Sequence, residues 1–156
     1  DIFGAPIPRP TDRFSEEYED VVIYSQNGTA SKETGIVWVF AANWGWVESQ
    51  FGPMLAAARG IEQLADNEYL ATVWERIINL ERAFNDREGM DRQNDTLPRR
   101  LLTEPLQTRG APGEGQVVSH QDDFLDRYYE LRGWSREGIP QPKKLEDLKL
   151  GFAVKK

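Results

Sequence analysis

Residues 66–89, DNEYLATVWERIINLERAFNDREG, carry the clearest helical pattern in the sequence. Asp66 is a typical N-terminal capping residue, and Gly89 is a typical residue for the end of a helix. Apolar side chains recur three or four residues apart between them, as they do on one face of an α-helix; they are Leu70, Val73, Trp74, Ile77, Ile78, Leu80 and Phe84. The stretch therefore predicts a long amphipathic helix.

Shorter helices are predicted on both sides of this one. Pro53 suits a first helical turn and Gly60 a C-terminal cap, so we expect a helix over 53–59. Pro142 can begin a last short helix with Leu145 and Leu148 facing inward. Both segments would add apolar surface to the core that the long helix covers.

A further helix is predicted to end at Gly133. Ser119 and Asp122 have the spacing of a capping box, and the apolar stripe that follows has helical periodicity. The stripe consists of Phe124, Leu125, Tyr128, Tyr129 and Leu131. We expect this face to pack against the rest of the domain.

Other parts of the chain predict irregular structure. Residues 1–14 contain three prolines at alternate positions and predict an extended arm. Residues 25–32, SQNGTASK, are typical of a turn, and residues 91–115 of a long loop. In 33–51 the apolar residues are consecutive, so strand and helix both stay open. We expect a mainly α fold: an irregular helical domain over 15–156 with long loops, preceded by the arm.

Composition excludes several functions. The formal charge is −7, from 19 Lys and Arg against 26 Asp and Glu, which disfavours nucleic acid and anionic membranes as partners. No apolar run approaches the roughly 20 residues that cross a bilayer, so we expect a cytoplasmic protein. The sequence contains no Cys, and it therefore offers no thiolate for catalysis or metal binding. His120, its one histidine, is predicted to be a solvated surface residue.

Three patterns in the sequence are candidates for chemistry. Glu81 and Glu88 share a helical face, but no apolar pocket in the local pattern would raise the pKa of either. Residues 109–115, RGAPGEG, lack the strand and the Lys-Ser/Thr of a phosphate-binding loop. The aromatic residues of 38–51 favour core packing, with a surface buried by a partner as the alternative.

Two motifs resemble a known family. Residues 76–89, RIINLERAFNDREG, followed by 94–100, NDTLPRR, are similar to a signature of the C-terminal helical domain of the aldehyde:ferredoxin oxidoreductase family. Residues 128–134, YYELRGW, with Gly138 and Pro140, resemble the end of that domain. The resemblance runs roughly from Glu17 to Leu150.

This resemblance implies part of an oxidoreductase that oxidises aldehydes and passes electrons to ferredoxin or another carrier. Its cofactors would be tungsten, or molybdenum, held by two pterin dithiolenes, and a [4Fe-4S] cluster. The chain would be active only with the remaining base and Cys-containing domains and would bind no cofactor alone. Arg76, Glu81, Arg82 and Arg87 would tie helices together rather than touch substrate.

The family motif Asp-Ser-x-x-x-Cys, with Phe two places on, matches residues 33–38, ETGIVW, and Phe40. The resemblance therefore implies cofactor-binding positions at Glu33, Val37 and Trp38, and it implies no catalytic residue or metal ligand. Trp38 stands at the Cys position, and indole does not ligate iron. Either another group supplies that ligand, or no standard cluster is present, or redox function is lost. The alternative function is a cofactor-free helical interaction or scaffold subunit.

Overall fold

The structure is a computed structural model that describes residues 19–36, 51–110 and 113–154. Within these ranges the chain forms helices and no β-strand, apart from one isolated bridge between Trp134 and Pro140. The mainly α prediction is thus confirmed. The elements in chain order are α1 (Glu19–Thr34), α3 (Phe51–Arg59), η2 (Glu62–Ala65), α4 (Asn67–Arg87), α5 (Arg99–Thr103), α6 (Gln121–Arg132), α7 (Pro142–Asp147) and η3 (Gly151–Ala153).

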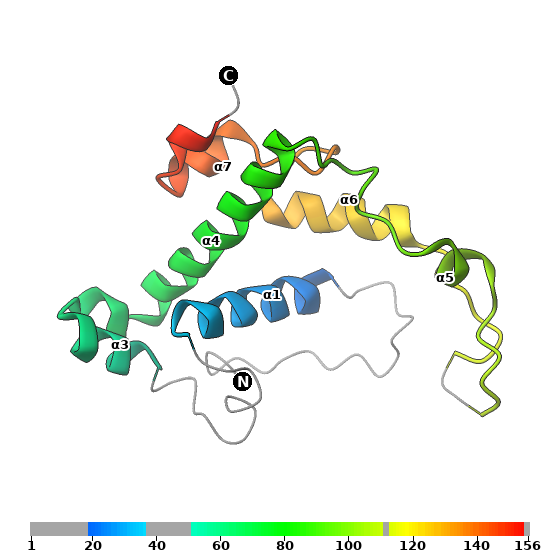
Figure 1. Ribbon diagram of the computed structural model, residues 1–156, viewed down its shortest axis with the longest axis horizontal. Coiled ribbons are helices and arrows are strands. Elements are labelled where there is room, and N and C mark those ends of the chain that lie inside the picture. Colours follow the sequence, from blue (N-terminus) through cyan, green and yellow to red (C-terminus); the bar gives the residue numbers. More distant parts are fainter. Residues whose placement is uncertain (1–18, 37–50, 111–112, 155–156) are drawn as a thin grey trace.

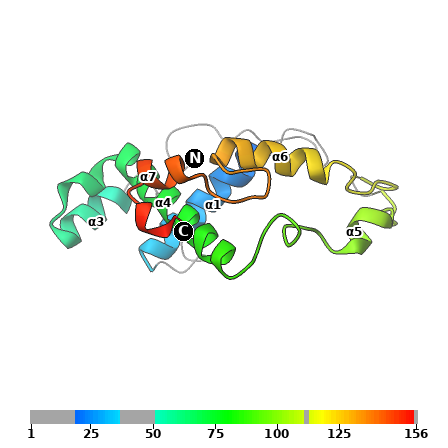
Figure 2. The same cartoon turned by 90° about the horizontal axis from the view of Figure 1, so that it is seen from above.

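Helix α4 is the long helix that the sequence predicts, and it forms the spine of the molecule (Figure 1). Asp66 caps its N-terminus, because the Oδ1 atom accepts a hydrogen bond of 2.9 Å from the backbone N–H of Glu68. Helices α1 and α6 pack together beside it, with α3 near one end of α4 and α7 near the other. The segment that contains α5 projects away from this body in both views (Figure 2).

The turn predicted over 25–32 is wrong, since these residues belong to α1. The polar side chains that favour turns bond instead to carbonyls one helical turn back: the Thr29 hydroxyl donates to the Ser25 carbonyl at 3.0 Å, and the Ser31 hydroxyl to the Gly28 carbonyl at 2.8 Å. Gly28, Ala30 and Ser31 are buried. Small residues at these positions let α1 lie close to α4.

Among the described residues, the buried apolar side chains form three small clusters along α4. The first contains Ala30, Phe51, Leu70 and Trp74, the second contains Ala83, Leu145, Leu148 and Leu150, and the third contains Tyr128, Tyr129 and Trp134. The predicted burial of Leu145 and Leu148 is confirmed.

The apolar stripes are only partly buried. Leu80, Phe84 and Leu131 were expected to face inward but are 40, 53 and 50% exposed. Their places are taken by polar side chains of α4 and α6, because Asn79 and Arg132 are fully buried. Hydrophobic periodicity identified the helices but not the face that each helix buries.

Helix ends agree with the sequence in some places and differ in others. Gly133 adopts the left-handed conformation at the end of α6 (φ 71°), and Pro142 begins α7, both as predicted. The capping box at Ser119 is wrong, because the N-cap of α6 is His120 and its side chain makes no capping hydrogen bond. The long loop over 91–115 contains the short helix α5. The predicted arm over 1–14 and most of 33–51 lie outside the described residues.

Candidate functional site

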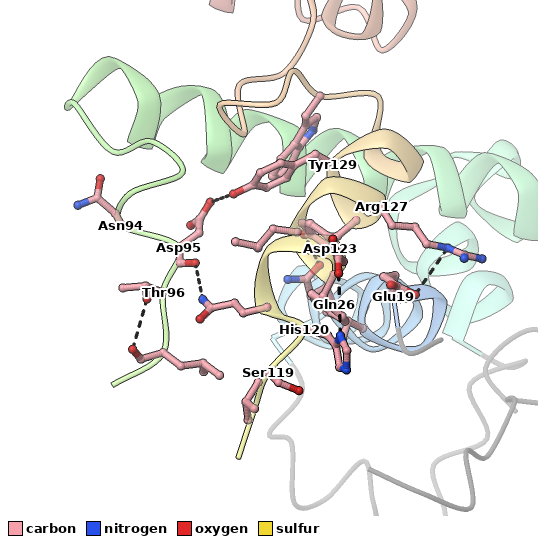
Figure 3. Close-up of a pocket in the computed structure, with 18 of the residues that line it drawn as sticks. Glu19, Gln26, Asn94, Asp95, Thr96, Ser119, His120, Asp123, Arg127 and Tyr129 are labelled. Atoms are coloured by element: carbon pink, nitrogen blue, oxygen red, sulfur yellow. Dashed lines mark hydrogen bonds and ion pairs between the residues drawn. The ribbon is translucent and has the colours of Figure 1, made fainter. Parts of the chain in front are cut away.

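A groove of about 1440 Å³ opens between α1, α4, α6 and the segments that flank α5 (Figure 3). Val22, Ile78 and Leu125 form apolar parts of its lining. Its polar lining residues include Glu19, Gln26, Glu81, Arg82, Asn85, Asp95 and Tyr129. The groove therefore offers both hydrogen-bonding groups and aromatic surface, and the side chains of three helices converge on it.

Three residues that line the groove, Arg82, Asp95 and Tyr129, form a polar cluster with Gly138, which we call the Arg82 cluster. The Arg82 guanidinium binds both carboxylate oxygens of Asp95, at 2.8 and 2.6 Å, and its Nε donates to the Gly138 carbonyl at 2.7 Å. The Tyr129 hydroxyl donates to the same carboxylate at 2.5 Å. A two-point guanidinium contact fixes the plane of the carboxylate as well as its position.

The electrostatics of this cluster keep Asp95 ionised. Burial raises the pKa of Asp95, but the hydrogen bonds and charge of Arg82, with the Tyr129 hydroxyl, outweigh burial and hold that pKa below its usual range. Burial and the neighbouring carboxylate raise the pKa of the Tyr129 hydroxyl well above its ordinary value. Tyr129 is therefore a hydrogen-bond donor at physiological pH rather than a general base.

A second polar group lies where α1, α4, α6 and α7 meet, and we call it the Arg132 network: Gln26, Asn27, Glu75, Arg132 and Lys144. The buried Arg132 guanidinium donates to Glu75 at 2.7 Å, to Asn27 at 2.9 Å and to Gln26 at 2.7 Å. Lys144 binds the other oxygen of Glu75 at 3.1 Å. Burial raises the pKa of Glu75, but the two cations hold it below its ordinary value.

The sequence-predicted site residues are dispersed. Glu33 lies in the last turn of α1 with an exposed side chain, and its carbonyl accepts a hydrogen bond from the N–H of Ile36. Val37 and Trp38 lie outside the described residues. Glu81 lines the groove, whereas the carboxylate of Glu88 is 3.7 Å from Arg87 and does not line it. The structure thus does not bring this carboxylate pair into one cleft.

The α4 arginines, which were predicted to tie helices together, differ in what they contact. Arg76 donates to the Leu148 carbonyl at 2.8 Å, which ties α4 to the end of α7. Arg82 binds Asp95 in the following loop and the Gly138 carbonyl. Arg87 lies over the ring of Phe84, within its own helix.

His120 is 55% exposed at the groove, as the sequence predicts for a surface residue, and its Nδ1 lies 3.9 Å from Asp123. No group of three or more metal-binding side chains occurs among the described residues. Within the same ranges, no helix is long and apolar enough to span a membrane.

Sequence reasoning from pattern alone missed Asp95 and the partners of Arg132. Asp95 is 13 residues from Arg82, and Asn27 is 105 residues from Arg132. Local spacing rules extend over only about four residues on a helix, so they carry no signal for such pairs. The family motifs contain Arg82, Asp95, Tyr129 and Arg132, which was the available indication that these residues act together.

Comparison with known proteins gives a consistent result. The family model described as aldehyde ferredoxin oxidoreductase, domains 2 and 3, matches residues 2–150. Tungsten-containing aldehyde ferredoxin oxidoreductases of Pyrococcus abyssi and Pyrococcus furiosus are 36% and 34% identical to the chain, over 96% and 95% of its length. The chain spans about a quarter of each of these relatives, 24%.

A solved structure is also similar. It is the active site complex BamBC of benzoyl coenzyme A reductase in complex with 1,5-dienoyl-CoA, with a TM-score of 0.53 and 33% sequence identity. The similarity covers 67% of this chain and 14% of that one. Sequence motifs, family model and structural similarity agree, and the chain belongs to the aldehyde ferredoxin oxidoreductase family.

Proposed function

We propose that this chain is part of a tungsten-containing oxidoreductase that oxidises aldehydes to carboxylic acids and passes the electrons to ferredoxin. The observation that carries the proposal is the identity of 36% over 96% of the chain with a tungsten-containing aldehyde ferredoxin oxidoreductase. Because the chain spans 24% of that relative, activity in this proposal requires the rest of the enzyme.

The contribution of this chain, in the proposal, is to build one wall of the enzyme and to present Glu33, Val37 and Trp38 toward the cofactor. The Arg82 cluster and the Arg132 network support this role, because they fix α1, α4 and α6 around the groove. We assign no catalytic residue to the chain. In this proposal residues 15–156 form one helical domain. The protein acts in the cytoplasm and has no nucleic acid as a partner.

The residues present fit one of the expected cofactors and not the other. An exposed carboxylate such as that of Glu33 can accept hydrogen bonds from the N–H groups of a pterin, and the bound metal would supply the redox chemistry. A [4Fe-4S] cluster needs thiolate ligands, and the sequence contains no Cys. Any such cluster would take all its thiolates from outside this chain.

Metal analysis of the complete protein, purified from its native source without a denaturing step, tests the proposal. We expect tungsten or molybdenum together with a larger Cys-containing polypeptide or region, and aldehyde-dependent reduction of ferredoxin or a viologen dye. A protein without tungsten or molybdenum would contradict the proposal. It would favour the cofactor-free helical scaffold instead, a reading for which the Trp at the Cys position is the supporting observation.

A second candidate reaction is supported by the similarity to the benzoyl coenzyme A reductase complex. In that case the substrate would be an aromatic thioester of coenzyme A, which is reduced rather than oxidised. The same preparation distinguishes the two reactions: dye reduction that depends on an aldehyde supports the first, and dye oxidation that depends on benzoyl-CoA supports the second.

A further inference from the structure

Helix α1 buries little apolar surface that would fix its rotation about its own axis. Its apolar side chains are spread around the helix, and the residues that it buries are Glu19, Gly28, Ala30 and Ser31. Val22 and Ile23, which are partly buried, pack against the third apolar cluster. Apolar burial is non-directional, so this helix needs other contacts to select one orientation.

The Arg132 network supplies such contacts. One guanidinium binds two consecutive residues of α1, through the side-chain carbonyls of Gln26 and Asn27 at 2.7 and 2.9 Å. Consecutive residues of an α-helix point about 100° apart. A planar group that holds both side chains therefore restricts the rotation of α1 and its position along the axis at once.

Burial and contacts with neighbouring helices hold Arg132 itself in place. It has an exposed fraction of 0%, and its charge is paired with Glu75 of α4. Glu75 in turn accepts from Lys144, and also from the Asn79 amide at 3.1 Å. Tyr128 donates to the same Gln26 carbonyl at 2.7 Å. These contacts thus fix the orientation of α1 relative to α4, α6 and α7 together.

Gln26 and Glu33 are seven residues apart, so they lie on the same face of α1, about 10 Å apart along its axis. A rotation of α1 by about 20° would move a side-chain tip by about 2 Å, given a helix radius of about 5–6 Å with side chains. A displacement of about 1 Å is already costly for positioning in an active site. The orientation of α1 therefore decides where the Glu33 carboxylate lies.

We propose that Arg132 is a positioning residue that fixes the rotation of α1 and thereby places Glu33 for its contact with the pterin. The second half of this statement rests on the proposed function. That Arg132 fixes the rotation of α1 concerns only the described residues and does not depend on the cofactor.

The test compares Arg132→Met with Arg132→Lys and a control in the complete protein. Methionine keeps most of the volume but removes the charge and the donors, whereas lysine keeps the charge without the planar fork. Leu145→Ala is the control, because Leu145 is a buried residue of the second apolar cluster, which contains no residue of α1. The free energy of unfolding is measured for each variant, and the α1 exchange rates are compared after correction for differences in this free energy.

Two readouts separate the halves of the proposal. Hydrogen exchange of the α1 amides reports the attachment of the helix, and the electron paramagnetic resonance signal and tungsten content report the cofactor. For Arg132→Met we expect α1 exchange at least about tenfold faster than in Leu145→Ala, because the variant loses the hydrogen bonds from the guanidinium to Gln26 and Asn27, and a hydrogen bond to a charged group contributes about a factor of ten or more. We also expect an altered tungsten signal, partly restored in Arg132→Lys.

Equal α1 exchange in Arg132→Met and Leu145→Ala would overturn the positioning role. Faster α1 exchange with an unchanged tungsten signal would overturn the link to Glu33. Wild-type protein that contains no tungsten or molybdenum would overturn the proposed function and, with it, the cofactor half of the inference. The α1 exchange data would still decide the first half in that case.

Discussion

Replacing Gly138 with alanine tests whether the Arg82 cluster is as tightly packed as its distances indicate. Gly138 has φ +76°, a conformation that alanine adopts at a cost of about 1–2 kcal/mol. A Cβ atom there would overlap Nη2 of Arg82 and would lie 2.9 Å from Cζ and 3.0 Å from the hydroxyl of Tyr129. Such overpacking costs about 1–3 kcal/mol more.

We therefore expect Gly138→Ala to lower the free energy of unfolding by about 2–5 kcal/mol. Gly60→Ala is the matched control, because Gly60 has φ +67° and no heavy atom lies within 4 Å of its added Cβ. The control isolates the backbone cost of about 1–2 kcal/mol. Urea denaturation of both variants measures the difference, which we attribute to the displaced Arg82 and Tyr129 side chains. Equal destabilisation of the two variants would refute this account of the cluster.

Three further predictions concern the core, the helix start and acid stability. Leu70→Ala should cost about 2–5 kcal/mol in urea denaturation because Leu70 is 1% exposed, whereas Leu80→Ala, at 40% exposure, should cost well under half as much; similar losses would show that Leu80 is covered. Asp66→Ala should cost about 1 kcal/mol through loss of the α4 cap, and no change would contradict the capping geometry. The pKa of Asp95 is depressed in the folded state, so its stabilisation is complete above about pH 4 and is lost as the pH falls through the folded pKa. Asp95→Asn should therefore be less stable at neutral pH and should lose less stability on acidification, and an acid titration slope equal to that of the wild type would contradict this.

Long-range polar pairs explain where sequence reasoning about the site failed. The i,i+4 spacing on α4 would pair Arg82 with Asp86 one turn away, but the structure pairs Arg82 with Asp95 from the next loop. The same spacing would pair Glu75 with Asn79, and these two side chains do interact, at 3.1 Å. The second pair is local and the first is not. Spacing rules describe neighbours on one helix and carry no information about a loop that folds back onto it.

The same limit of local sequence rules is seen in the fold, at residues where the local preference and the tertiary packing differ. In residues 25–32 the local preference is for a turn, and the tertiary structure makes them part of α1, because packing of Gly28 and Ala30 against α4 outweighs that weak preference. Leu80 and Phe84 continue the helical stripe of α4 but remain exposed. Periodicity states that a face is apolar, and only the neighbouring elements decide whether that face is covered.

The sequence by itself determined the mainly α class, the long helix with its Asp66 cap, the left-handed Gly133 at the end of α6, the start of α7 at Pro142 and membership of the family. These features depend on backbone chemistry or on contiguous motifs, so they can be predicted from residues that are close together in the sequence. The tertiary structure alone decided the groove, the Arg82 cluster and the Arg132 network. Each of these joins residues that are far apart in the chain, and the pairing of buried charges depends on distances that exist only after the helices have packed.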